Sequence, residues 1–303
     1  MGRGVFCAAD ENNDGFADIV RFMFRQRVFP TNIVVLTDSD RTMFVTDING
    51  KVYKLTDQTG SGLADAKFRE YFVPATDAIL PLTADAFWLG SASYPNALLS
   101  QLEMNGQRIS LPSSDSTPGA GRSIISMAKG QNDSLYLVDM IEGVLRRIPN
   151  TTPFSFLDWS RPAIMTKEYP TAVKVASDGR GRIFLLIAGV DRFLPPEPSS
   201  GPQAPPQTIS VQSKIVVFRE TSGALVREQE IIPGLGPWQV PFSPFNGLAV
   251  KGENVYAIST TYSQDGPVSE IHRINLQTKQ ATRFLSTYDV GNVLLTGLAV
   301  MGN

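Results

Sequence analysis

Short apolar runs recur along this chain, each with a small polar residue in front and an aromatic residue behind. A turn follows each leading run, and a second run then carries the aromatic side chain. The leading residues are Asn32, Asp77, Ser123, Thr171, Asn246 and Thr296, and the aromatics are Phe44, Trp88, Tyr136, Phe184 and Tyr256. Successive leading residues lie 45, 46, 48, 75 and 50 positions apart. Units of about 45 residues that hold several strands each predict a β-propeller.

A longer stretch of the sequence supports the same repeat. Residues 4–18 read GVFCAADENNDGFAD, and residues 51–65, which lie 47 positions later, read KVYKLTDQTGSGLAD. Each copy has a β-prone run, a polar loop with glycine and then a second alternating run, as a hairpin does. Further strand-like runs follow the aromatics at 51–55, 143–148, 214–218 and 270–274. No helical pattern separates the runs, which disfavours a parallel α/β fold.

The repeat predicts one all-β domain over residues 1–303, a six-bladed β-propeller. Five units are complete, and the sixth is expected to combine residues 296–300 with the hairpin of residues 4–24. The N- and C-terminal strands would then close this blade and leave no free sheet edge between them. The composite blade has one strand fewer than the usual four. This is expected if the sequence is a fragment of a longer precursor.

A proline-rich insertion accounts for the spacing of 75 residues. Residues 194–207 read LPPEPSSGPQAPPQ, and proline has no N–H to give to a β-ladder. We therefore expect a long surface loop inside the fourth blade. A polyproline II docking segment is the alternative interpretation.

Composition and charge exclude some partners and leave others open. The net charge of −2 and the pI of about 5.6 give no electrostatic basis for binding nucleic acid. No apolar run approaches the roughly 20 residues that span a bilayer. The one cysteine, Cys7, excludes an internal disulfide, and we interpret it as a small buried hydrophobe.

The loop from Asp10 to Asp18 is the candidate metal site. Its oxygen-bearing side chains alternate along the chain at Asp10, Asn12, Asp14 and Asp18, as a calcium ligand set requires. The alternative is a turn that its own side chains stabilise by hydrogen bonds, and the sequence does not decide between the two. In the corresponding loop of the second copy, at residues 57–65, only Asp57 and Asp65 are carboxylates, so the turn is favoured there.

The leading residues form a second candidate site. First strands line the central channel of a propeller, so the six leading residues are expected to form a ring at the channel mouth. Through Asp77, Asn32 and Asn246 such a ring could hold a cation, and the alternative is that it holds water.

Two known families share local motifs with the chain. The loop D-x-x-x-x-G-x-A-D at Asp10–Asp18, after Val5-Phe6, resembles the glucose/sorbosone dehydrogenase-like group of six-bladed propellers, best over residues 4–73. That resemblance implies pyrroloquinoline quinone, calcium, oxidation of a sugar and a histidine base at the channel mouth. The only histidine, His272, instead lies in the strand-like run SEIHRIN. The run Asn246–Ala249 is similar to the N-G-L-A element of gluconolactonase-like propellers, which implies a metal-ligating asparagine, but no matching glutamate is present.

Three functions follow from these observations. We expect a non-catalytic, extracytoplasmic binding or structural module, calcium-stabilised, with a protein or carbohydrate partner. The alternatives are a quinone-dependent sugar dehydrogenase and a metal-dependent lactone hydrolase. The absence of a histidine from the leading positions argues against the dehydrogenase, because proton abstraction needs a base within reach of the substrate.

Overall fold

A computed structural model of the chain describes most of the expected strands. The described residues are 5–24, 30–37, 42–47, 51–57, 59, 69–72, 78–83, 86–90, 99–103, 108–110, 124–139, 143–149, 163–169, 171–188, 190–194, 207–211, 213–231, 247–263, 266–290 and 294–300. Strands dominate these residues, and the helical elements among them are short 3₁₀ turns such as η1 (Gln131–Asp133) and η3 (Thr287–Val290). The expected all-β class is therefore confirmed.

Five antiparallel four-stranded sheets follow one another along the chain, and we call them units 1 to 5. Unit 1 is β3 (Pro30–Thr37), β4 (Thr42–Asp47), β5 (Lys51–Thr56) and β6 (Arg69–Phe72). Unit 2 is β7 (Ala78–Thr83), β8 (Ala86–Gly90), β9 (Leu99–Glu103) and β10 (Arg108–Ser110). Unit 3 is β11 (Ile124–Lys129), β12 (Leu135–Asp139), β13 (Val144–Ile148) and β14 (Ala163–Thr166). Unit 4 is β15 (Ala172–Ser177), β16 (Arg182–Ile187), β19 (Lys214–Thr221) and β20 (Ala224–Ile231), and unit 5 is β21 (Leu248–Lys251), β22 (Asn254–Ser263), β23 (Gly266–Asn275) and β24 (Ala281–Ser286).

Two further sheets have two strands each. The N-terminal hairpin pairs β1 (Val5–Ala9) with β2 (Ile19–Phe24). A second hairpin, β17 (Val190–Leu194) and β18 (Gln207–Val211), is inserted between the second and third strands of unit 4. The two ends of the proline-rich segment, at Leu194 and Gln207, therefore belong to strands within the fourth unit, a hairpin that the sequence did not reveal. Residues 195–206 lie outside the described part of the chain.

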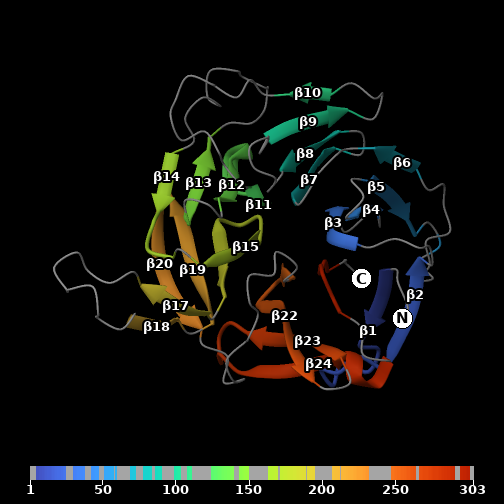
Figure 1. Cartoon of the computed structure of the whole chain (residues 1–303). Coiled ribbons are helices and arrows are strands. Elements are labelled where there is room, and N and C mark those ends of the chain that lie inside the picture. Colours follow the sequence, from blue (N-terminus) through green and yellow to red (C-terminus); the bar gives the residue numbers. More distant parts are fainter. Residues whose placement is uncertain are drawn as a thin grey trace.

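The units are arranged around a centre in chain order, as a β-propeller requires (Figure 1). First strands of successive units are neighbours, from β3 through β7, β11 and β15 to β21. Between units 3 and 4 this contact is a pair of hydrogen bonds, because Ser126 Oγ accepts from Val175 N at 3.0 Å and donates to Val175 O at 3.4 Å. Each first strand therefore faces the middle of the molecule.

Residues 294–300 continue this inner series although they form no strand. A Cβ atom placed on Gly297 would lie 3.0 Å from the backbone nitrogen of Ile33, in β3. A Cβ atom on Gly247, next to β21, would lie 2.4 Å from the Cβ atom of Leu298. Residues 294–300 therefore pack between the first strands of units 5 and 1, and both glycines are needed for this close approach.

The sequence predicts six blades, but the described strands form fewer than six four-stranded sheets. Among the described strands the ladders build five such sheets, and the N-terminal hairpin has two strands. Residues 294–300 join no described ladder, so the described strands form no sixth four-stranded sheet. A β-propeller arrangement is what the structure shows.

Four of the five repeating aromatics lie in the core, and Tyr256 is half-buried. Phe44, Trp88, Tyr136 and Phe184 are fully buried. Each aromatic sits on a second strand, directly opposite one residue of the third strand: Phe44 opposite Lys54, Trp88 opposite Gln101, Tyr136 opposite Arg147, Phe184 opposite Val217 and Tyr256 opposite Arg273. Each periodic aromatic thus lies on the second strand of its unit, as the repeat predicts.

A buried ion pair joins units 3 and 4. Glu220, at the end of β19, accepts hydrogen bonds from Arg147 Nε at 3.1 Å and from Gln131 N at 3.1 Å. Its side chain is 4% exposed and that of Arg147 is 16% exposed. Donors from the neighbouring unit therefore take the place of water around the Glu220 carboxylate. Removal of Glu220 or Arg147 would leave the charge of the other side chain buried and uncompensated.

We predict that Glu220→Ala lowers the free energy of unfolding by about 2–4 kcal/mol, because the Arg147 guanidinium loses its buried partner. The matched control is Glu228→Ala, which breaks a solvent-exposed pair with Arg219 on the same sheet and should cost less than about 1 kcal/mol. Urea unfolding of the three proteins measures both values. Equal losses from the two substitutions would contradict a special role for the contact between units.

Candidate functional site

The loop Asp10–Asp18 connects β1 to β2, and its side chains hydrogen-bond within the loop. Asp18 Oδ2 accepts from the backbone nitrogens of Glu11 at 2.8 Å and Asn12 at 3.2 Å. Asn12 Oδ1 accepts from Asp14 N at 2.8 Å, and Asp14 Oδ1 accepts from Phe16 N at 2.9 Å. These are the local bonds of the turn interpretation, in which Asx side chains satisfy nearby backbone donors.

Three of the four predicted ligands do come together. The Asn12 side-chain amide donates to Asp14 Oδ2 at 3.2 Å and to Asp18 Oδ1 at 3.0 Å. The amide nitrogen thus lies between the two carboxylates, where a cation would have to compete with it. Among the described residues no group of three or more His, Cys, Asp or Glu side chains has an arrangement that could hold a metal ion.

The fourth predicted ligand, Asp10, faces unit 5. Its Oδ2 accepts from Gly15 N at 3.0 Å and lies 3.6 Å from Arg273 NH1, which belongs to β23. A Cβ atom on Gly15 would come within 2.3 Å of the Arg273 side chain, and Gly15 has a φ of +98°. Only glycine fits there, so the guanidinium fixes the loop against unit 5. The backbone bond from Ala17 N to Phe284 O, 2.9 Å long, holds the other side of the loop to β24.

The channel-mouth ring can be followed at three of its six positions. Asp77, Ser123 and Asn246 lie outside the described residues. Asn32 and Thr296 both line one cavity, and Asn32 Oδ1 accepts from the backbone nitrogen of Ile33 at 2.9 Å. Thr171 precedes β15 and does not line that cavity. The ring therefore stays a prediction, with two adjacent members located beside the cavity.

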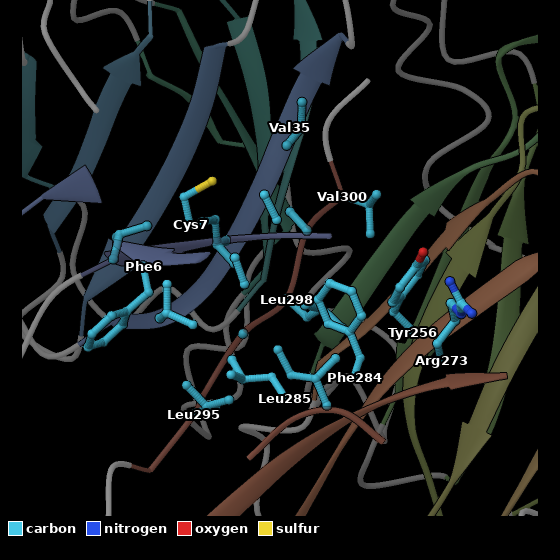
Figure 2. Close-up of a pocket in the computed structure, with 18 of the residues that line it drawn as sticks. Phe6, Cys7, Val35, Tyr256, Arg273, Phe284, Leu285, Leu295, Leu298 and Val300 are labelled. Atoms are coloured by element: carbon cyan, nitrogen blue, oxygen red, sulfur yellow. The ribbon is translucent and has the colours of Figure 1, made fainter. Parts of the chain in front are cut away.

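That cavity lies between the N-terminal hairpin and residues 294–300, and the sequence analysis did not anticipate it. It has a volume of about 550 Å³ and extends between β1, residues 294–300, the first two strands of unit 1 and residues from all four strands of unit 5. Figure 2 shows Phe6 and Cys7 of β1 on one side, Leu295, Leu298 and Val300 along the C-terminal segment, and Phe284 with Tyr256 on the side of unit 5. The lining is mainly apolar, so the cavity suits an apolar or mixed ligand surface better than an ion.

His272 lies in the core rather than at the channel mouth. Its side chain is 1% exposed, and its Nε2 atom lies 2.9 Å from Ser259 Oγ and 3.3 Å from Glu270 Oε2. Both neighbours thus meet the same ring nitrogen, whereas a catalytic triad needs the serine and the acid on opposite nitrogens. Burial lowers the pKa of His272 below its usual range, the Arg283 charge lowers it further, and Glu270 opposes both.

Comparison with known proteins gives the fold and no family. The sequence matches none of the known family models, and it matches no curated protein. Among solved structures, TolB from Acinetobacter baumannii is similar with a TM-score of 0.53 at 9% identity, over 88% of this chain and 56% of TolB. A functionally unknown protein from Desulfotomaculum acetoxidans DSM 771 is similar with a TM-score of 0.57 at 8% identity, over 96% of this chain and 94% of that one. The structure of U3-55K gives 0.50 at 12% identity, over 93% and 88%.

These likenesses support the β-propeller arrangement alone, because the identities are too low to carry function. The chain spans little more than half of the TolB length, at 56%. The narrower resemblance to the glucose/sorbosone dehydrogenase-like group stays a prediction. Among the described residues there is also no helix long and apolar enough to cross a bilayer.

We predict that His272 makes the protein less stable in mild acid. Its pKa is lowered in the folded state, so below about pH 6.5 the unfolded chain binds a proton that the folded protein does not. Stability is therefore highest above that pH and falls as the pH drops toward the folded-state pKa. Because the sequence has one histidine, His272→Gln should flatten the unfolding free energy between about pH 7 and pH 5.5. Identical pH profiles for the two proteins, measured by urea unfolding, would contradict this.

Proposed function

We propose that the protein is a six-unit β-propeller, closed by its two ends, that acts as a non-catalytic binding module outside the cytoplasm. The position of residues 294–300 between the first strands of units 5 and 1 supports the six-unit closure. The Asn/Ser/Thr-rich loops and the local resemblance to a quinoprotein group support the extracytoplasmic location. A protein partner fits the propeller architecture, and a carbohydrate partner is the alternative.

The observation that carries the binding function is the cavity of about 550 Å³ at the junction of the ends. It lies within the range of roughly 300–1,000 Å³ that ligand sites occupy, and apolar side chains form most of its wall. Binding there needs no base, nucleophile or metal. His272, the histidine that a dehydrogenase of the resembled group would use, is instead enclosed among Ser259, Glu270 and Arg283.

The non-catalytic function is tested by an assay for sugar oxidation, which the proposal excludes. The protein is reconstituted with pyrroloquinoline quinone and calcium and supplied with aldoses, and reduction of a redox dye is followed. We expect no oxidation, because a base poised near neutral pH contributes roughly 10²- to 10⁴-fold to such a step and the histidine is buried. A robust rate that depends on the quinone and is abolished by Asp77→Asn would make the protein a sugar dehydrogenase. Asp77 is the one carboxylate among the six leading residues.

We further propose that calcium stabilises the loop Asp10–Asp18. The grouping of Asn12, Asp14 and Asp18 supports this, since rotation of the Asn12 amide would present its oxygen between two carboxylates. Calcium binding would have to be more favourable in free energy than the loop's own hydrogen bonds, which it would replace. We therefore expect a weak affinity for calcium.

Titration calorimetry on the wild type and on Asp14→Ala tests the calcium site. We expect measurable heat for the wild type and a clear loss for the variant, because one of the two carboxylates next to Asn12 is removed. Asp178→Ala serves as the control, since Asp178 lies in a turn of unit 4 and pairs with Arg182. Absence of heat in the wild type, or the same heat in Asp14→Ala, would rule the site out.

A further inference from the structure

One arginine position recurs in units 3 and 5, and its surroundings differ between the two. Arg147 and Arg273 each lie on a third strand, directly opposite the periodic aromatic of the second strand. In unit 3 the guanidinium is enclosed, because Arg147 NH2 lies 3.0 Å from Glu220 and the Arg147 side chain is 16% exposed. Arg273 is 28% exposed, and its ion contact with Asp10 is 3.6 Å long. The arginine that is closed off between units 3 and 4 is therefore more open where unit 5 meets the N-terminal hairpin.

The Arg273 guanidinium has more donors than its two polar neighbours use. A guanidinium carries five N–H donors and no acceptor. Asp10 meets it through Oδ2, which already accepts from Gly15 N, while Asp10 Oδ1 is buried and accepts no hydrogen bond. The second neighbour is the Tyr256 hydroxyl, whose pKa is raised by burial and lowered by the Arg273 charge. One carboxylate oxygen and one hydroxyl therefore leave donors of Arg273 available at the cavity.

Arg273 belongs to a polar end of the cavity, which unit 5 forms. Tyr256 lies opposite Arg273 in the ladder of β22 with β23. Asn254, two residues before Tyr256, shares its face of the sheet and lies opposite Lys251 of β21. These four residues line the cavity, and Figure 2 shows Tyr256 and Arg273 together at one end of it. The charged residues among the described lining are Asp10, Lys251 and Arg273, so the lining carries one positive charge in excess.

The rest of the cavity wall is mainly apolar, and it begins on the same face of unit 5. Ile271 lies two residues from Arg273 along β23 and so shares its face, and Leu285 lies opposite Ile271. Strand β1 and residues 294–300 supply most of the remaining wall. The volume of about 550 Å³ equals that of roughly 18 water-sized groups at about 30 Å³ each. The cavity therefore matches a molecule with a small apolar body and one charged end.

We propose that the cavity binds a small amphipathic acid, whose carboxylate is held by Arg273 and whose apolar body lies between unit 5, β1 and residues 294–300. The planar guanidinium matches a carboxylate through two parallel hydrogen bonds. The excess positive charge favours an acid over an amine, and the apolar wall favours such an acid over an inorganic anion. This inference names a ligand class for the proposed binding function and rests on it.

The probes are decanoate and decanol, which share one alkyl chain and differ in the charge of the head group. Their dissociation constants are measured by titration calorimetry in calcium-free buffer, at concentrations below aggregation of either compound. The variants are Arg273→Gln, Arg273→Lys and, as the matched control, Arg283→Gln. Arg283 lies on the neighbouring strand of unit 5, its side chain is 59% exposed, and it is not among the residues that line the cavity.

We expect Arg273→Gln to weaken decanoate binding about tenfold or more, because charge-assisted hydrogen bonds are lost, and to change decanol binding less than about twofold. Arg273→Lys keeps the charge without the planar fork, so its affinity for decanoate should lie between those of the wild type and Arg273→Gln. Arg283→Gln should leave both affinities unchanged. Decanoate at ten times its Kd should also slow the alkylation of Cys7 by N-ethylmaleimide about tenfold, because Cys7 lines the apolar part of the cavity.

Asp10→Asn separates a binding role of Arg273 from a structural one. The substitution keeps the shape of the side chain and an oxygen that can accept from Gly15 N, but it removes the charge that competes for the guanidinium. We expect it to tighten decanoate binding several-fold and to leave decanol binding unchanged. Loss of a purely structural contact would tighten neither. This variant and the wild-type measurements keep the test decisive if Arg273→Gln does not fold.

Four results would overturn the proposal. Absence of decanoate binding to wild-type protein with intact circular dichroism would show that there is no acid site. Equal weakening of decanoate and decanol by Arg273→Gln would show damage to the cavity instead of a lost head-group contact. An equal effect of Arg283→Gln would show a dependence on overall charge, and unchanged alkylation of Cys7 would place decanoate elsewhere.

The outcomes also distinguish this proposal from the proposed function on which it rests. If decanol binds and protects Cys7 while decanoate does not, the cavity is a binding site and only the acid class is wrong. The dye-reduction assay tests the non-catalytic function separately, since it needs neither decanoate nor decanol.

Discussion

Each four-stranded sheet in this protein has two faces to cover, and only its neighbours around the ring can cover both. The largest buried cluster extends through units 3, 4 and 5 without interruption. Ser126 with Val175 and Glu220 with Arg147 connect adjacent units at the inner and outer strands. The stability of any one unit therefore depends on the next, and the junction where the ends meet is where this mutual cover is thinnest.

The junction shows this in its packing. The cluster around Val5, Met43 and Tyr53 joins the N-terminal hairpin to unit 1 and includes Cys7 at its border. On the other side, Arg273 and Phe284 attach the loop of the hairpin to unit 5. The hairpin is thus held through both neighbours while one edge of its own sheet faces a cavity.

Much of the fold could be predicted from the sequence, because its strongest signals are local. Leading polar residues and aromatics at regular spacing located the first and second strands, and the proline-rich segment located the insertion. The hairpin β17–β18 was missed, since proline and glycine conceal short strands. The pairing of Glu220 with Arg147, or of Asp10 with Arg273, could not be predicted, because it depends on which strands of different units become neighbours.

The candidate site was harder to predict for the same reason. Asp10, Asn12, Asp14 and Asp18 form a visible motif, but whether their oxygens meet a cation or backbone amides depends on loop geometry, and the hydrogen bonds favour the amides. The cavity has no motif at all. It lies between β1, residues 294–300 and strands of units 1 and 5, so no single stretch of the sequence marks it.

The contact between residues 5–24 and residues 294–300 also bears on the order in which the protein folds. These two segments line one cavity, although they lie far apart in the sequence. Units 1 to 5 can pair their strands locally, whereas this contact must close the longest loop in the molecule and bears its entropic cost. The hairpin is therefore expected to be enclosed late, and until then its apolar side is open to contact with other chains.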